Sequence, residues 1–150
     1  AIMSFIEKEF PDISLISRDP SVYARTIEII KIFELYVEYQ ARHFYPYVFF
    51  GAEQNLDNSE EIKVKISRGL NIIEKKAAFN PYILGEFSYA DIYASLVLST
   101  TCEVCKRIYN WDIFQDFKKL AEVIKVINSR ETAKIIHDDI AKGMEALKKS

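Results

Sequence analysis

The stretch YILGEFSYADI, residues 82–92, determines the fold that we predict for this chain of 150 residues. It reads as a loop that becomes a helix in one step. Ser88 is the expected N-cap, because its hydroxyl can accept from the backbone N–H of Asp91 while the Asp91 carboxylate accepts from the backbone N–H of Ser88. Phe87 and Ile92 have the spacing of a hydrophobic staple across this capping box.

The residues after the cap predict a buried helix. Residues 92–99, IYASLVLS, carry no charge. A helix that is apolar on all sides in a globular protein is normally central and covered by other elements. We therefore predict an all-α bundle around one central helix that runs from Ser88 to about Tyr109.

The rest of the chain predicts about six helices in all. With 4 Gly and 4 Pro there are few turn-forming residues, which favours long helices over many short strands. A second capping box is expected at Asn58 and Glu61. The helix at residues 58–79 is expected to turn Ile62, Ile66, Leu70 and Ile73 inward. The last helix is expected to turn Ile136, Ile140, Met144 and Leu147 inward. The expected helices cover residues 2–10, 20–45, 58–79, 88–109, 117–129 and 132–147, and Pro46 should end or kink the second of them.

Composition excludes several classes of protein. Hydrophobic residues make up 49% and charged residues 28%, which is a globular balance. A net charge of −2 gives no sign of a nucleic-acid-binding surface. No apolar run approaches the roughly 20 residues of a membrane span, and the two cysteines do not form a secreted disulfide framework. We therefore expect a cytoplasmic protein that binds neither nucleic acid nor membranes.

The second helix carries the candidate binding residues. It has two apolar stripes, which predicts two different partners. One stripe faces the core, and the other, more aromatic one faces a ligand pocket, a second subunit or both. Core packing alone would also explain the aromatic residues. The candidate substrate-binding residues are Tyr36, Tyr39, Gln40, His43, Phe44 and Tyr47.

Other reactive residues have simpler structural explanations. Ser88 and Asp91 are expected to cap a helix rather than to act as nucleophile and base, since no histidine is near them in sequence. Cys102 and Cys105 form a C-x-x-C pattern well inside a helix, whereas redox pairs of this kind lie at helix N-termini. Their expected role is that of buried thiols. We predict no catalytic residue and no metal site in this chain.

The stretch 82–92 resembles the signature at the start of the buried helix in the C-terminal domain of glutathione transferases. The Ser or Thr of that signature falls on Ser88, its Ala on Ala90 and its Asp on Asp91. The order of helices agrees, and Asp19-Pro20 resembles the family's entry to its helical domain. Residues 2–6 resemble the last helix of the family's thioredoxin-like domain. Arg130 is followed by Glu131, where the family often has Arg-Pro.

The resemblance implies a domain organisation. Residues 1–18 would be the end of the N-terminal domain and a linker, and residues 19–150 would be the helical domain. The thioredoxin-like domain, which binds glutathione and activates its thiol, is absent from the chain. We therefore expect this chain to lack transferase activity when it is alone.

The resemblance also implies partners. The whole enzyme would be a homodimer that conjugates glutathione to small hydrophobic electrophiles, and this domain would supply the second-substrate site and the dimer contact. The alternative is a non-catalytic interaction module like that of stringent starvation protein A or the gamma subunit of a translation elongation factor. An enzyme should show an open apolar cleft beside Tyr39 and Phe44, whereas an adaptor should fill that space with side chains.

Overall fold

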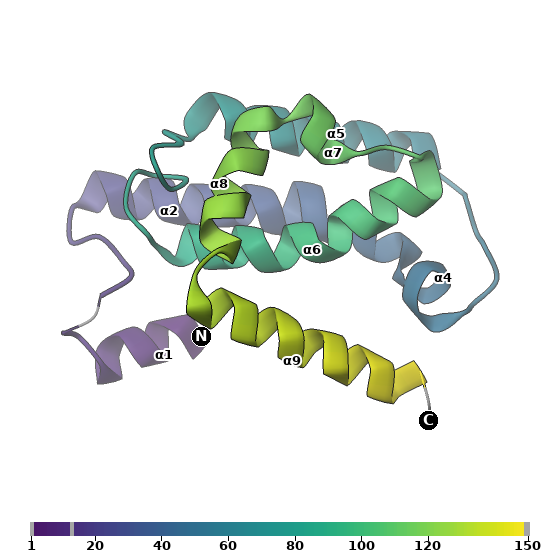
Figure 1. Cartoon of the computed structure of the whole chain (residues 1–150). Helices are drawn as coiled ribbons and strands as arrows, with labels where there is room; N and C mark the ends of the chain where they lie inside the picture. Colours follow the sequence, from purple (N-terminus) through teal and green to yellow (C-terminus); the bar gives the residue numbers. More distant parts are fainter. Residues whose placement is uncertain (1, 13, 149–150) are drawn as a thin grey trace.

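The computed structural model describes residues 2–12 and 14–148. These residues form helices and no strand, which confirms the all-α prediction (Figure 1). The elements are α1 (Ile2–Glu9), α2 (Pro20–Ile32), a π-helical segment η1 (Phe33–Glu38), α3 (Tyr39–Ala41), a 3-10 turn η2 (Arg42–Phe44), α4 (Tyr45–Phe50), α5 (Ser59–Lys76), α6 (Tyr89–Tyr109), α7 (Ile113–Asp116), α8 (Lys118–Asn128) and α9 (Glu131–Lys148).

Helix α6 is the central element of the bundle, as predicted. It packs against α2, η1, α4 and α8, and Figure 1 shows α5 and α7 on its upper side and α1 and α9 on its lower side. Ala90, Ala94 and Val104 of this helix are completely buried. The burial is not continuous around the helix, however, because Leu96 is 38% exposed. One stripe of the central helix therefore remains open to a ligand or partner.

The predicted capping box is present at the start of α6. The Asp91 carboxylate accepts from the Ser88 N–H at 2.9 Å, and the Ser88 hydroxyl faces the N–H groups of the first turn. The other oxygen of Asp91 accepts from the Ile83 N–H at 2.9 Å, a contact that the sequence did not predict. Burial raises the pKa of Asp91, and these hydrogen bonds oppose that rise. One buried carboxylate thus holds the 77–88 loop against the central helix.

Replacing Asp91 with Ala should lower the free energy of unfolding by about 2–4 kcal/mol. The reason is that the Ile83 and Ser88 N–H groups would be buried without acceptors. Asp19→Ala is the matched control, because Asp19 caps α2 in an exposed position and should cost only about 1 kcal/mol. Urea unfolding of both variants measures the difference, and equal losses would show that the second contact of Asp91 contributes nothing.

The second predicted capping box is wrong. Asn58 has a φ of 59° and its side chain makes no capping hydrogen bond. Asparagine tolerates this left-handed conformation, which lets the loop turn into α5 through the Ser59 N–H donating to the Leu56 carbonyl. The carboxylate of Glu61 pairs with Lys65 at 2.6 Å instead. The backbone of the loop, rather than a side chain, starts this helix.

Helix α5 also ends earlier than predicted. It stops at Lys76, because Ala77 is extended and the N–H groups of Ala78 and Phe79 donate to the Ile83 carbonyl. The predicted inner face of this helix is correct, since all four of its members are buried: Ile62, Ile66, Leu70 and Ile73.

The predicted long second helix is interrupted rather than regular. It passes through the π-helical segment η1 and the 3-10 turn η2 before α4 begins at Tyr45. Pro46 lies in the first turn of α4, where its missing N–H costs no hydrogen bond. The interruption redirects the chain across the end of α6. The hydrophobic periodicity of the sequence does not reveal the π-helical segment, because the chain is helical on both sides of it.

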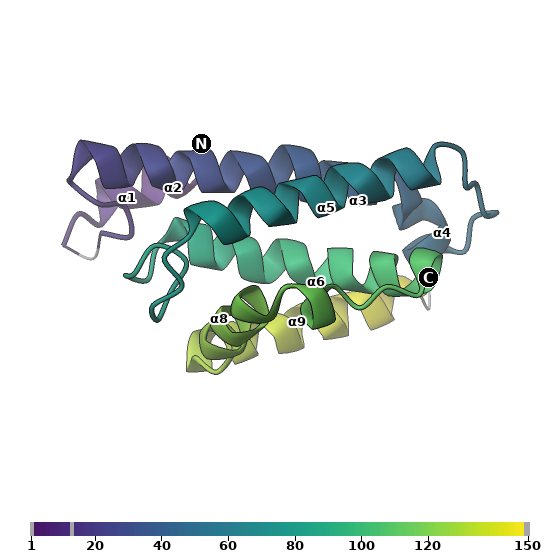
Figure 2. The ribbon, with the colours of Figure 1, turned by 90° about the horizontal axis from the view of Figure 1, so that it is seen from above.

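Helices α2 and α5 run side by side (Figure 2), and Gly69 of α5 lies against η1, which continues α2. A Cβ atom added at Gly69 would lie 2.7 Å from Cβ of Tyr36 and 3.1 Å from Cγ2 of Val37. Such distances are below normal van der Waals contact, so the π-helical segment η1 requires a glycine opposite it.

Gly69→Ala should therefore destabilise the protein by about 1–2 kcal/mol, since overpacking outweighs the gain in helix propensity. Gly143→Ala is the control, because nothing lies within 4 Å of its added Cβ. That change should be neutral or stabilise by up to about 1 kcal/mol. Thermal unfolding of both variants separates the two effects, and a stabilising Gly69→Ala would contradict the close approach.

The predicted inner face of the last helix is wrong. Ile136 is 47% exposed and Ile140 is 43% exposed, and Ile135 beside them is 54% exposed. Met144 is half-buried, and the side chain of Leu147 lies outside the described residues. The helix packs against α8 only near its start, so most of its apolar face has no neighbour among the described residues. Amphipathic patterning predicted a face that packs but not where its partner lies.

Candidate functional site

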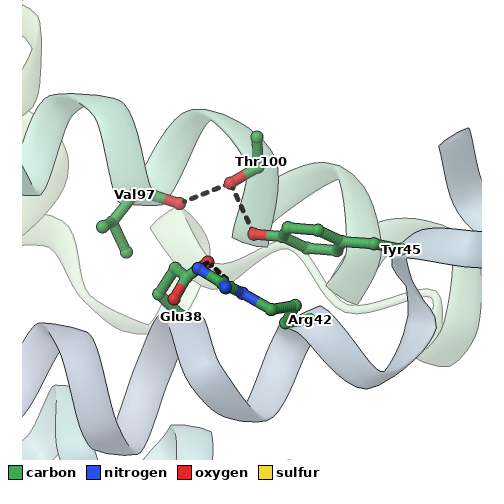
Figure 3. A network of polar contacts seen from close by, with 5 residues as sticks. All are labelled: Glu38, Arg42, Tyr45, Val97 and Thr100. Atoms are coloured by element: carbon green, nitrogen blue, oxygen red, sulfur yellow. Dashed lines mark hydrogen bonds and ion pairs between the residues drawn. The ribbon is translucent and has the colours of Figure 1, made fainter.

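A cluster of polar side chains lies between the interrupted second helix and α6 (Figure 3). The hydroxyl of Tyr45, on α4, is 2.9 Å from Oγ1 of Thr100 on α6. Thr100 donates its own proton to the Val97 carbonyl at 3.1 Å. Because Thr100 has one proton to give, Tyr45 is the donor of the hydrogen bond between them. This bond fixes the tyrosine hydroxyl at the surface of the central helix.

An ion pair lies beside the tyrosine. Nη2 and Nε of Arg42 donate to the same oxygen of Glu38, at 2.6 and 2.9 Å (Figure 3). The Glu38 side chain is 12% exposed, whereas that of Arg42 is 62% exposed. The carboxylate therefore anchors the guanidinium, which keeps part of its donor edge open to a ligand.

The ionisation of this cluster favours neutral phenols beside a cation. Burial raises the pKa of Tyr45, and the charge of Glu38 adds to that rise. Burial also raises the pKa of Tyr93 on α6, with the charges of Glu34 and Glu38 adding to it. The hydrogen bond to Glu38 raises the pKa of Arg42. Near neutral pH the site therefore presents the hydroxyl donor of Tyr93 and the guanidinium of Arg42, whereas Tyr45 gives its proton to Thr100.

The open stripe of α6 connects this cluster to the N-terminal helix. Tyr89, Tyr93, Leu96 and Thr100 are spaced by four, three and four residues, which places them on one face of the helix. At the start of this stripe the Tyr89 hydroxyl donates to α1, with the Met3 carbonyl at 2.9 Å and a carboxylate oxygen of Glu7 at 3.0 Å. The site therefore lies on the side of the bundle that α1 occupies.

None of the six candidate residues from the sequence belongs to this cluster, and three of them share a groove elsewhere. Tyr39, Gln40 and His43 come together around a groove of about 440 Å³ between the second helix and α5. Arg42, Asn58, Glu61 and Lys65 line the same groove, so polar and apolar groups are mixed on its walls. This groove is not the apolar cleft expected of an enzyme at this position. A binding role for its residues stays a prediction.

The remaining candidate residues are separated from one another. Tyr36 lies in a neighbouring groove of about 320 Å³ that Leu35 and Ile72 also line. Phe44 is 1% exposed and packs edge-to-face with His43 and Tyr109, so it belongs to the core. Tyr47 is 37% exposed on α4. These three candidate side chains thus lie in three different surroundings: a groove, the core and the exposed face of α4.

Sequence reasoning missed Tyr93 and Thr100. A signal for them exists, because the four-residue and three-residue spacing from Tyr89 gives one polar-tipped face on a helix that otherwise reads as apolar. The involvement of Arg42 had no such signal, because it depends on the turn at η2.

The cysteines have the environment of buried thiols, as the sequence indicated. Cys105 is completely buried and Cys102 is partly buried, and both are free. Burial raises the pKa of each thiol to about 12. Thiolates are the reactive form of cysteine, so this environment disfavours redox chemistry at neutral pH.

Residues 2–12 and 14–148 contain neither a membrane-spanning helix nor a cluster of metal ligands. No helix among them is both long enough and apolar enough to cross a membrane. No three His, Cys, Asp or Glu side chains in this part of the chain are grouped in a way that could hold a metal ion.

The fold is an all-helical bundle of the kind found in the C-terminal domain of glutathione transferases. A glutathione S-transferase of Pseudomonas putida (strain F1) is 26% identical to the chain over 139 residues, which are 91% of the chain. This similarity confirms the resemblance stated from residues 82–92. The chain spans 63% of the length of that relative. No family model matches the chain.

Proposed function

We propose that this chain is the helical domain of a glutathione transferase and forms the site for its second substrate. The similarity to a glutathione S-transferase along 91% of the chain is the observation that carries the proposal. Because the chain spans 63% of that relative, the proposed enzyme includes a thioredoxin-like domain outside residues 1–150 that binds glutathione. The proposed reaction is conjugation of the glutathione thiolate to a small hydrophobic electrophile, either by addition or by substitution, in which an aryl halide loses its halide ion as the carbon–sulfur bond forms.

The second-substrate site proposed here lies at Tyr45, Tyr93 and Arg42. Helix α1 resembles the last helix of a thioredoxin-like domain, and it packs at the start of the open stripe on α6. A domain that continues from α1 would therefore face this stripe. The groove at Tyr39 opens instead between the second helix and α5. This geometry favours Tyr45 and Tyr93 over Tyr39 as the residues nearest the thiolate.

The chemistry of the cluster suits that role. Conjugation moves negative charge from the thiolate sulfur onto the electrophile as the carbon–sulfur bond forms. The Tyr93 hydroxyl and the Arg42 guanidinium can donate hydrogen bonds to that charge, and the tyrosine rings and the arginine stem supply apolar contact area. Glu38 holds Arg42 in place without neutralising all of its donors.

In the full gene product, Tyr93→Phe should lower kcat/KM for the conjugation of an aryl halide about tenfold. That factor corresponds to roughly one neutral hydrogen bond that is made in the transition state. Tyr39→Phe should leave kcat/KM unchanged, and the 150-residue chain alone should show no conjugation. Steady-state kinetics with glutathione in excess provides the measurement.

Three outcomes of these measurements would each contradict one part of the proposal. A loss with Tyr39→Phe and none with Tyr93→Phe would move the site to the groove beside α5. Conjugation by the isolated chain would contradict the requirement for a second domain. Absence of conjugation by the full gene product, with glutathione and a panel of electrophiles, would contradict the transferase proposal itself.

We further propose that the outer face of η1 and α5 forms a homodimer contact. Apolar side chains are exposed there on both elements, with Leu35 at 51% and Val64 at 64%. Tyr36, 40% exposed, and Tyr39, 64% exposed, extend the same surface. Large exposed apolar side chains that gather on one face are typical of an interface.

Leu35→Arg combined with Val64→Arg should convert a dimer to a monomer, because charges would be buried against their symmetry copies. Val126→Arg is the control, since Val126 is 40% exposed on α8, away from this face. Sedimentation velocity measures the mass of each. A wild-type protein that is monomeric at micromolar concentration would contradict the proposed contact.

The non-catalytic alternative has one observation in its favour. The space beside Phe44 is filled by core side chains. An adaptor would use the exposed faces of the bundle and need no substrate site. The conjugation assay on the full gene product separates this alternative from the enzyme.

A further inference from the structure

A second cavity lies where α8 turns into α9 beside the first half of α6 (Figure 1). Its volume is about 260 Å³, slightly below the roughly 300–1,000 Å³ of clefts that hold drug-sized ligands. Nearly all of its accessible wall is apolar, and Leu15 of the 10–19 connection closes one side. The apolar wall is formed by Leu15, Phe87, Ile92, Leu96, Ile127, Ala133 and Ile136.

The wall is held in place by a hydrogen-bonded triangle between three helices. The Ser95 hydroxyl donates to Oδ1 of Asn128 at 2.6 Å, and Nε2 of His137 is 3.1 Å from Oγ of Ser95 and 3.3 Å from the same Asn128 oxygen. Since Ser95 gives its proton to Asn128, Nε2 of His137 carries a proton and donates to both oxygens. The serine is therefore not activated as a nucleophile, and the triangle positions α9.

Arg130 is the one residue with a permanent charge among the described residues that line this cavity. Its Nη1 donates to the Tyr82 hydroxyl at 3.0 Å, and its guanidinium carbon lies 3.9 Å from the centre of the Phe87 ring. Its Nε atom is buried and has no hydrogen-bond partner within the described part of the chain. No carboxylate lines the cavity among those residues. A buried cationic donor without an acceptor is unfavourable, so an anionic ligand would be stabilised there.

We propose that this cavity binds a small organic carboxylate with a compact apolar body, whose carboxylate group contacts Arg130. The apolar wall would cover the hydrocarbon part, and a small rotation of the flexible arginine would bring its free donors to the carboxylate oxygens. Leu96 belongs both to this cavity and to the open stripe of α6, but Tyr45, Tyr93 and Arg42 do not line the cavity. The proposed binding requires no glutathione, so its test is independent of the transferase proposal.

Isothermal titration calorimetry on the 150-residue chain tests this site with three probes of equal chain length. Octanoate should bind at least about tenfold more tightly than octanol, which has the same apolar body without the charge. Octylammonium should bind more weakly than either, because its charge opposes that of Arg130. Equal affinities for octanoate and octanol, or tighter binding of octylammonium, would overturn the proposal.

Two variants locate the binding. Arg130→Gln should reduce the affinity for octanoate to that for octanol, whereas Arg68→Gln, an exposed arginine on α5, should not change it. Ala133→Phe should abolish octanoate binding by filling the cavity, whereas Ala141→Phe, exposed further along α9, should preserve it.

The variants also guard against a folding artefact. Arg130→Gln loses the contacts with Tyr82 and Phe87, so circular dichroism should first confirm that it is folded. If it is not, Ala133→Phe and the three probes decide the question without it. Unchanged octanoate affinity in folded Ala133→Phe would place the binding elsewhere and overturn the assignment.

Discussion

The buried carboxylate of Asp91 is the contact on which the arrangement of this bundle depends. It accepts from Ser88 within the first turn of α6 and from Ile83 in the preceding loop. The loop is thereby tied to the helix that all the longer elements contact. Because these partners are buried backbone N–H groups, loss of the carboxylate leaves two donors without their acceptor. The same residue thus starts the central helix and positions the chain that enters it.

The central helix in turn decides where ligands can bind. Three of its sides are covered, and the fourth presents Tyr93, Leu96 and Thr100 beside the N-terminal helix. The interrupted second helix delivers Tyr45 and Arg42 to that side, because η2 redirects the chain before α4. A regular helix through residues 20–45 would not have turned these residues toward α6. The irregular backbone is consistent with a functional surface at this place.

The C-terminal helix α9 is held at its start and exposed further along. Its first part is fixed by His137, which donates to Ser95 and Asn128, and its later part exposes Ile140. The fixed part closes a cavity with a lone cation. The exposed part has an apolar face without a neighbour among the described residues. One amphipathic helix therefore serves a ligand cavity at one end and a surface at the other.

The sequence by itself determined the fold class, the central helix and its capping box. These features depend on contacts between residues that are at most a few positions apart, such as Ser88 with Asp91, and on runs of apolar residues. It also indicated that Cys102 and Cys105 are buried, because their place inside a helix is a local property. The inner face of α5 was predicted for the same reason.

Only the tertiary structure decided which aromatic residues share a site. Tyr39 and Phe44 were both predicted to bind the substrate, yet Tyr39 is 64% exposed and Phe44 is buried in the core. The π-helical segment and the following turn rotate the stripe, and periodicity at 3.6 residues cannot record that rotation. The meeting of Tyr45 with Thr100, and of Arg130 with Phe87, likewise joins residues far apart in sequence. Such contacts are set by how the helices pack, which a local pattern does not contain.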